Sequence, residues 1–141
     1  MKLELVTLLG KKVDQDVYGV TLPTAAGEIS VYAGHEPLVT LAVPGVIAVR
    51  HNKQDSEEKL EYFAISGGIV EIGSEGMRVL VDEADHGEDI VEAESKAALE
   101  RAMKLRDNAK DQVELEQAHQ LVDKHEVRLK VAGLRRHRRR K

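Results

Sequence analysis

The distribution of glycine, proline and aromatic residues divides this chain of 141 residues near Gly87. Residues 1–87 contain ten of the 11 glycines, all three prolines and all four aromatic side chains, whereas residues 88–134 contain one glycine, Gly133, and no proline or aromatic residue. Glycine, proline and β-branched residues are typical of turns and strands, while Ala, Leu, Glu, Lys and Gln are typical of helices. The division therefore predicts an α+β chain with an all-β domain over residues 1–87 and an α-helical segment over residues 88–134.

The first part contains several short runs that are typical of strands. Turn-prone clusters such as residues 33–37 and 73–76, and the polar run 51–59, separate them. In the run 77–81, Met77, Val79 and Val81 alternate with Arg78 and Leu80, so one face is suited to burial. Closely spaced short strands of this kind favour a β-sandwich or flattened barrel. The predicted strand regions are 2–5, 17–22, 28–32, 46–50, 61–66, 69–72 and 77–81.

The second part contains apolar or small residues at heptad spacing in two sets, which predicts two helices. Turn-prone residues at 107–111 separate the sets, so an antiparallel two-helix hairpin is expected. Its seam is rich in alanine, which buries about one methyl group, or about 0.8 kcal/mol, per residue. A hairpin with this seam is marginally stable alone. The predicted seam positions are Val91, Ser95, Ala98, Ala102, Leu105 and Ala109 in the first helix, and Leu115, Ala118, Val122, His125, Leu129 and Ala132 in the second.

Charge is unevenly distributed, with an acidic body and a basic end. Residues 1–87 carry a net charge of −7 and residues 88–134 one of −3, whereas the expected tail, residues 135–141, has six basic side chains and no acidic one. Such a tail can bind nucleic-acid phosphates, anionic lipid headgroups or an acidic protein surface, or it can be a solubilising segment. The acidic body and the absence of aromatic residues from 64–141 argue against nucleic acid.

The sequence lacks the residues that most enzyme classes need. There is no cysteine, which excludes disulfides, thiolate metal sites and a cysteine nucleophile. No phosphate-binding or dinucleotide-binding glycine motif occurs, and Ser66-Gly67-Gly68 is interpreted as a strand–turn with left-handed glycines. His119 and Asp123 are spaced for two metal ligands but lack a third. We therefore predict no catalytic, cofactor or metal site. The longest uncharged stretch, residues 37–49, is shorter than the roughly 20 apolar residues of a membrane-spanning helix.

Four segments together carry a resemblance to a known family. Residues 27–40 (GEISVYAGHEPLVT), 44–47 (PGVI), 65–72 (ISGGIVEI) and, more loosely, 79–84 (VLVDEA) are similar, in order, to segments of the epsilon subunit of bacterial F-type ATP synthases. The resemblance implies a sandwich of about ten short strands followed by a helical hairpin. It also implies a non-catalytic rotor subunit of the central stalk, held peripherally at the cytoplasmic face of the bacterial cell membrane.

The resemblance further implies partners and the residues that meet them. The sandwich would bind the gamma subunit and the ring of c subunits, the latter through a loop containing Glu28, Tyr32, His35 and Pro37. The hairpin would inhibit ATP hydrolysis when it extends towards the catalytic alpha and beta subunits. The basic residues expected to dock on an acidic segment of a beta subunit are Arg128, Lys130, Arg135, Arg136, Arg138, Arg139 and Arg140.

Three differences from the family bear on function. The tail is unusually rich in arginine, which implies either stronger inhibition or another anionic partner. Ser30 and Ala33 stand where the family usually has glycine and proline. At the start of the first helix, many members bind ATP through an Asp, an Arg and an Ala, where this chain has Val91, Glu94 and Ser95. The carboxylates gathered there repel phosphates, so no nucleotide site is predicted.

Two other classes of function remain to be compared with a rotor subunit. One is an adaptor whose β-domain binds protein and whose basic tail binds nucleic-acid phosphates. The other is a small hydrolase on a β-sandwich, which is disfavoured because no nucleophile, base and acid can be named.

Overall fold

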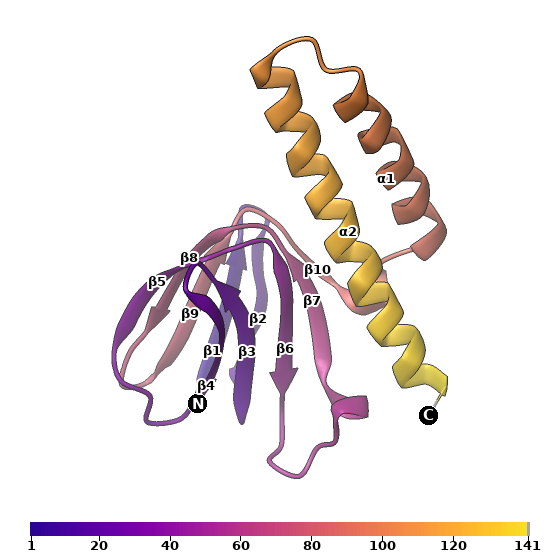
Figure 1. The fold of residues 1–141 in the computed structure, drawn as a ribbon. Coiled ribbons are helices and arrows are strands. Elements are labelled where there is room, and N and C mark those ends of the chain that lie inside the picture. Colours follow the sequence, from indigo (N-terminus) through magenta and orange to yellow (C-terminus); the bar gives the residue numbers. More distant parts are fainter. Residues whose placement is uncertain (141) are drawn as a thin grey trace.

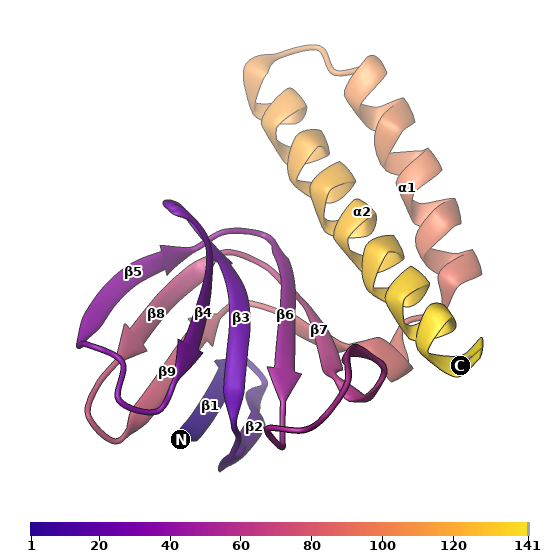
Figure 2. The same cartoon turned by 60° about the horizontal axis from the view of Figure 1, so that its bottom comes forward.

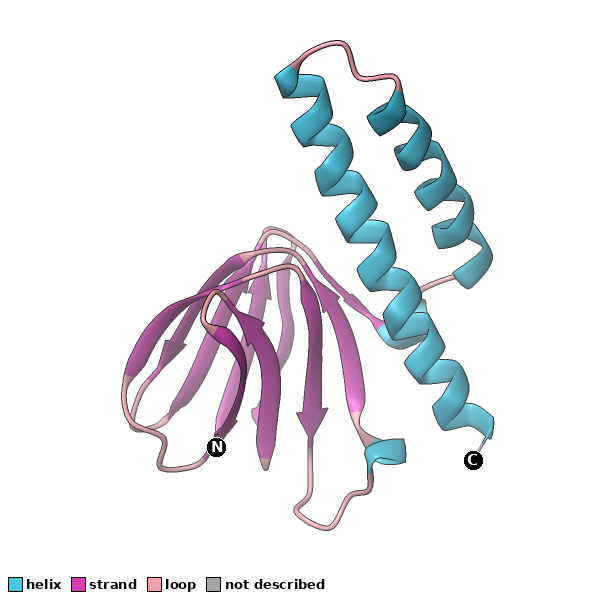
Figure 3. Cartoon of the chain, viewed as in Figure 1, coloured by secondary structure: helices cyan, strands magenta, loops and turns pink. Residues whose placement is uncertain are grey.

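The computed structural model describes the backbone of residues 1–140 and the side chains of residues 1–135. Ten strands precede two helices (Figures 1 and 3). The strands are β1 (Lys2–Thr7), β2 (Gly10–Asp16), β3 (Gly19–Thr24), β4 (Gly27–Tyr32), β5 (Leu38–Ala42), β6 (Gly45–Arg50), β7 (Glu61–Ile65), β8 (Gly68–Ile72), β9 (Gly76–Val81) and β10 (Ala84–His86). The helices are the 3₁₀ turns η1 (Glu57–Lys59) and η2 (Gly87–Asp89), and the α-helices α1 (Glu92–Asp107) and α2 (Gln112–Arg140).

The strands form one strongly curved sheet that folds over on itself. Its order is β10-β7-β6-β3-β5-β8-β9-β1-β2, with β4 pairing on β3. Strands β1 and β9 run parallel, and the other pairs are antiparallel. Figure 2 shows the strands wrapping around a common interior. The predicted α+β fold, a sandwich or flattened barrel of ten strands followed by an antiparallel helix pair, is confirmed.

The interior is filled by alternate residues of the strands. Side chains on one face of β1, β3, β6 and β9 are buried, whereas their neighbours face outward. Burying each large aliphatic side chain contributes about 1.5–3 kcal/mol, which stabilises the sandwich without help from the hairpin. The largest fully buried side chains of this core are Leu3, Leu5, Leu22, Ile47, Val20, Val31, Val49, Val70 and Val79.

Gly68 is required for close packing rather than for turn geometry. A Cβ atom there would lie 1.9 Å from the carbonyl oxygen of Leu80 on the neighbouring strand β9. The expectation of left-handed glycines at Gly67-Gly68 is wrong, since positive φ values occur instead at Gly10, Gly27, Gly34 and Gly76. The sequence pattern marked Gly68 correctly as a position that needs glycine. The reason, however, is the close approach of strand β9 and not the geometry of a turn.

Helices α1 and α2 are joined by a short turn with polar capping at both sides. The Asn108 side chain donates to the carbonyl of Lys104, and the Asp111 carboxylate accepts the Glu114 N–H at 2.8 Å. The expected end of the hairpin at residue 134 is wrong, because α2 continues through Arg140. Arginine is a good helix former, and positive charge near a helix C-terminus interacts favourably with the helix dipole. Lys141 lies outside the described residues.

The seam between the helices is narrow and made of small side chains. Its buried residues are Ser95, Ala102, Ala118 and Val122, all among the predicted positions. Val91 and Leu105, predicted at the same seam, are 51% and 57% exposed. Val91 precedes α1 in an extended conformation, so the heptad spacing does not apply to it. The seam prediction therefore holds in the middle of the hairpin and fails towards the ends of α1.

Candidate functional site

Helix α2 lies against the sandwich along β7, and α1 lies on its far side (Figure 1). A small apolar cluster makes the contact, with Val131 and Ala132 of α2 buried against Ala64 and Ile90. Gly87 faces Val131 so closely that a Cβ there would lie 3.1 Å from its Cγ1 atom. Four buried residues form a far smaller interface than the sandwich core, so apolar packing alone holds the hairpin weakly.

Polar contacts supplement this apolar contact along the same side of α2. The Arg128 Nη1 atom donates to Asp85 Oδ2 at 2.6 Å, and Lys124 Nζ lies 2.8 Å from Glu83 Oε2. Arg135 Nη1 donates to the carbonyl oxygens of Gly87 and Ile90, both at 2.8 Å. Asp85 lies in β10, and the two carbonyls lie in the linker that leads from the sandwich to α1.

Two of the predicted docking arginines are thus engaged within the chain itself. Arg128 and Arg135 hold α2 to the sandwich, whereas Lys130 is exposed. The side chains of the remaining predicted members, Arg136, Arg138, Arg139 and Arg140, lie outside the described part of the chain. Sequence reasoning missed the acceptors because Asp85 and Arg128 are 43 residues apart.

Towards the helical turn, α2 diverges from the sandwich and leaves a cavity of about 680 Å³. Ser66, Gly67 and Glu83 line it from the sandwich, and Gln117 and Leu121 line it from α2. In this region a cavity, rather than close packing, separates α2 from the sandwich.

His125 occupies the predicted seam without a hydrogen bond. Its Nδ1 atom is buried and has no partner among the described groups, as is also true of Arg135 Nε. Burial lowers the pKa of His125 below its ordinary value of 6.5, and the nearby cations Lys124, Arg128 and Arg101 lower it further. The lowered pKa favours the neutral imidazole.

The four residues predicted to form one ring-facing loop are separated. Glu28 lies at the start of β4, while Tyr32 ends that strand and packs on Tyr18 with ring centroids 5.4 Å apart. His35 and Pro37 follow in the next loop. Four residues of extended strand span about 13 Å, which places Glu28 at one end of the sandwich and the other three at the opposite end. The expectation of a single loop is therefore wrong.

An apolar row on the outer face of the sandwich was missed by sequence reasoning. Register places Leu41, Ile69, Leu80 and Val6 side by side across β5, β8, β9 and β1. Leu41 is 59% exposed, and Val39, also on the outer face of β5, is 73% exposed. The sequence did indicate this row, because the uncharged stretch 37–49 has more apolar residues than one buried strand face can accommodate.

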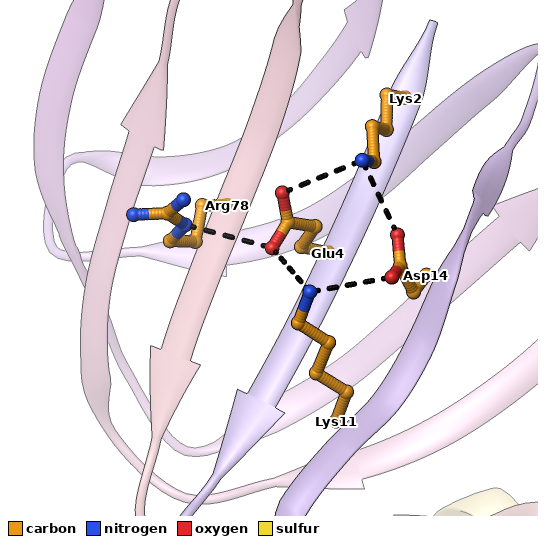
Figure 4. A network of polar contacts seen from close by, with 5 residues as sticks. All are labelled: Lys2, Glu4, Lys11, Asp14 and Arg78. Carbon is orange, nitrogen blue, oxygen red and sulfur yellow. Dashed lines mark hydrogen bonds and ion pairs between the residues drawn. The ribbon is translucent and has the colours of Figure 1, made fainter.

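A charged row runs beside the apolar row. Figure 4 shows Glu4 of β1 between Lys2, Lys11 and Arg78, with Asp14 completing the network. The Lys11 ammonium hydrogen-bonds Asp14 and holds the pKa of that carboxyl below its usual range. Exposed pairs of this kind contribute little to stability, so the row is better suited to orienting a partner.

The groove between α1 and α2 contains both carboxylate and basic groups. Glu94, Ser95 and Arg101 of α1 line it together with Lys124 and Arg128 of α2. Both cations of α2 are paired with carboxylates of the sandwich. The absence of a nucleotide site stays a prediction. That prediction considered only the start of α1, whereas α2 adds basic side chains to the same groove.

The described residues contain neither a metal-binding cluster nor a membrane-spanning helix. Residues 1–135 contain no group of three or more His, Asp or Glu side chains that is placed to hold a metal ion. Within the described residues, neither α-helix has a stretch that is long and apolar enough to cross a bilayer.

Comparison with known proteins identifies the family. Residues 1–87 match the family described as the β-sandwich domain of the ATP synthase delta/epsilon chain. The chain is 35% identical to the ATP synthase epsilon chain of Polaromonas naphthalenivorans over 86% of its length and 84% of that protein. It is 30% identical to the epsilon chain of Staphylococcus aureus over 96% of its length and 98% of that protein.

Solved structures agree with these matches. A chain in the Euglena gracilis mitochondrial ATP synthase (OSCP, F1 and c-ring) superposes with a TM-score of 0.76 at 26% identity, covering 89% of this chain and 77% of that one. A chain of the Tetrahymena thermophila mitochondrial ATP synthase central stalk and c-ring shares the fold, with a TM-score of 0.59 at 14% identity, covering 92% of this chain and 94% of that one. This protein belongs to the epsilon chain family, the non-catalytic stalk subunits of ATP synthase.

Proposed function

We propose that this chain couples the gamma subunit to the ring of c subunits in the central stalk and inhibits ATP hydrolysis through its C-terminal helices. Its place would be the F1 sector, held peripherally at the cytoplasmic face of the bacterial membrane. The observation that carries the inhibitory part is the contrast between a densely packed sandwich and a hairpin that four buried residues attach to it. An element attached so weakly can leave the sandwich without unfolding it.

The exposed apolar row is the surface best suited to the gamma subunit. Leu41, Ile69 and Leu80 lie on rigid strands, and contiguous exposed apolar side chains mark protein-binding surfaces. The charged row beside them supplies polar contacts at the edge of such an interface, as stable interfaces require. A Leu41→Glu substitution should abolish co-purification with gamma, and Leu9→Glu, at the exposed β1–β2 turn, serves as its control.

The direction of the chain indicates which end of the sandwich meets the ring. Strand β10 runs from Ala84 towards the end that holds Tyr32 and His35, and the linker to α1 leaves in that direction. A hairpin that extends towards the catalytic head must leave from the end distant from the ring. The ring would therefore face the opposite end, where Glu28 and the β3–β4 turn lie.

Single cysteines test this orientation cleanly because the chain has none of its own. In the assembled enzyme, Glu28→Cys should cross-link to a c subunit, and His35→Cys should not. Cross-linking of His35→Cys alone would reverse the orientation. Cross-linking of both residues only to alpha and beta subunits would refute the stalk placement.

Inhibition is tested by holding the hairpin against the sandwich. Cysteines at Glu83 and Lys124, whose side chains meet at 2.8 Å, can be joined by a bismaleimide that a reductant cleaves. The joined subunit should assemble without inhibiting ATP hydrolysis, and cleavage should restore inhibition. Equal hydrolysis before and after cleavage would overturn the proposed inhibition, while the stalk role would stand.

Nucleotide sensing is not part of the proposed function. Glu94 lines the groove between the helices, and Arg128 and Lys124 are paired with Asp85 and Glu83. Calorimetric titration of the isolated chain with ATP should therefore give no saturable binding at millimolar concentrations. A one-to-one isotherm that Arg101→Ala abolishes would show that the groove binds nucleotide.

The alternative of a nucleic-acid adaptor is not favoured by any described contact. Of the basic residues assigned to the C-terminal end, Arg128 and Arg135 are occupied with acceptors of the chain itself. Binding to duplex DNA that weakens steeply with salt would be needed to revive that alternative.

A further inference from the structure

The cavity of about 680 Å³ between α2 and the sandwich lies beside the turn from β7 to β8. Its volume is that of a small-molecule site, which typically spans about 300–1,000 Å³. We propose that this cavity binds a small organic cation with an apolar body, such as a hydrophobic amine. The site is independent of the proposed stalk function, because ligand binding there needs only the isolated chain.

One part of the cavity wall is apolar and comes from both sides. Four aliphatic side chains form it, two from β7 and two from α2, namely Ala64, Ile65, Leu121 and Val127. Leu121 is 38% exposed, although the adjacent Val122 is buried in the seam between the helices. An apolar side chain left open to water in a concave wall favours a ligand that covers it. The wall therefore suits a hydrocarbon or aromatic body.

The charged side chains of the wall leave an excess of negative charge. Lys124 Nζ lies 2.8 Å from Glu83 Oε2. Arg128 Nη1 lies 2.6 Å from Asp85 Oδ2. All four of these residues line the cavity, and each pair is neutral as a whole. Any further carboxylate of the wall therefore adds negative charge that no cation of the wall offsets.

Asp82 and Asp123 are the carboxylates that remain. Asp82 lies between β9 and β10, whereas Asp123 lies on α2, so the two line the cavity from opposite sides. Both are exposed, and neither has an ion pair among the described residues. A cation between them is attracted by both carboxylates, and an anion is repelled by both. The charge of the site therefore selects a cation over an anion of the same shape.

The uncharged polar groups of the wall are partly engaged and partly available. The Ser66 hydroxyl accepts the Glu83 N–H at 3.0 Å, so it is occupied within the chain. Gln117 and Gln120 of α2 also line the cavity. Their amide oxygens can accept hydrogen bonds from an ammonium group. An amine can therefore add hydrogen bonds to the ionic attraction.

Two ions of the same shape and opposite charge test the site on the isolated full chain. Tetraphenylphosphonium should shift the amide NMR signals of cavity residues such as Gly67 and Leu121, and should bind at least about tenfold more tightly than tetraphenylborate. The preference should shrink as salt rises, because salt screens exposed carboxylates. Equal affinities for the two ions at low salt would overturn the cation site. Shifts confined to Leu41 and Ile69 would place the probe on the outer apolar row and would also overturn it.

Single substitutions test which residues recognise the cation. Asp82→Asn and Asp123→Asn should each weaken tetraphenylphosphonium binding about threefold, as expected for exposed ion pairs. Leu121→Asn should weaken binding by at least as much, through lost apolar contact. Asp16→Asn, at an exposed carboxylate of β2 outside the cavity, is the matched control and should change nothing. Unchanged affinity in all three cavity variants, with the amide spectrum of a folded chain in each, would overturn the site.

Discussion

The sandwich and the hairpin bury residues of very different size. The sandwich core contains Leu3, Leu5 and Leu22 with no exposed surface, whereas the buried seam of the hairpin consists of Ser95, Ala102, Ala118 and Val122. A buried leucine contributes about 1.5–3 kcal/mol, against about 0.8 kcal/mol for each methyl of an alanine seam. The difference shows that one chain combines a rigid β-sandwich with a helical hairpin that can separate from it.

The largest expected effect is a loss of stability of the β-sandwich. Leu22→Ala, at a fully buried position of β3, should lower the free energy of unfolding by about 2–5 kcal/mol through lost burial and a cavity. Urea denaturation followed by circular dichroism measures it. Leu9→Ala, at a side chain 92% exposed in the β1–β2 turn, is the matched control and should lie within about 0.5 kcal/mol of the parent. Similar losses in both variants would contradict the assigned core.

A pair of truncations sharpens the role of the basic end. Removing residues 136–141 keeps Arg135 and its two linker hydrogen bonds, whereas removing residues 135–141 loses them. Both should relieve inhibition of ATP hydrolysis, because surface charges attract a partner at long range. Only the longer deletion should open the hairpin in the isolated chain, as measured by the distance between spin labels on Lys53→Cys and Lys110→Cys, two exposed positions. Full inhibition by both truncated chains at low and high salt would show that the basic end does not act in inhibition.

A smaller effect should follow from pH. The pKa of His125 lies below its ordinary value of 6.5 because burial and the cations Lys124, Arg128 and Arg101 disfavour its charged form, while Glu83 opposes them. Because His125 is buried between α1 and α2, the chain with these helices separated binds more protons, so the packed helix pair loses stability as pH falls below about 6.5 and regains it as pH rises. His125→Gln should flatten the pH dependence of helix-pair stability between pH 7 and 5, as measured by thermal unfolding followed by helical circular dichroism. An unchanged slope would assign the effect to other groups.

The smallest expected effect concerns a glycine inside α2. A Cβ at Gly133 would meet no atom within 4 Å, so alanine fits without strain. Gly133→Ala should stabilise the helix by about 0.5–1 kcal/mol, because alanine loses less conformational freedom. Thermal unfolding followed by helical circular dichroism, which reports the hairpin apart from the sandwich, measures this shift. A destabilised helix would contradict the open space assigned beside Gly133.

The fold followed from local patterns because those patterns have local causes. Alternation in β9 and heptad spacing around Ala102 and Ala118 reflect which face each element buries, and this information lies within a few neighbouring residues. The continuation of α2 through Arg140 escaped prediction because a run of arginines was interpreted by charge, although arginine also favours helix.

The candidate site was predicted less completely because it depends on contacts between distant segments. Arg128 was selected for its charge, but its acceptor Asp85 lies across the domain boundary. Glu28 and His35 were assigned to one loop, although the strand between them places them at opposite ends. The exposed row at Leu41 and Ile69 required the register between strands, which sequence alone does not fix.

Amide hydrogen exchange on the full isolated chain tests the central claim most directly, since it compares both regions in one experiment. If the hairpin separates from a sandwich that stays folded, the amides of α1 and of α2 up to Arg135 should exchange faster than those of β3 and β9. The opening that exposes the hairpin amides should be at least 100-fold more populated than the one that exposes the strand amides, a difference of about 2.7 kcal/mol in opening free energy. Asp85→Asn should speed exchange in the hairpin and leave the sandwich unchanged. Equal protection of both regions, with one common response to Asp85→Asn, would show that they unfold as a single unit and would contradict the account.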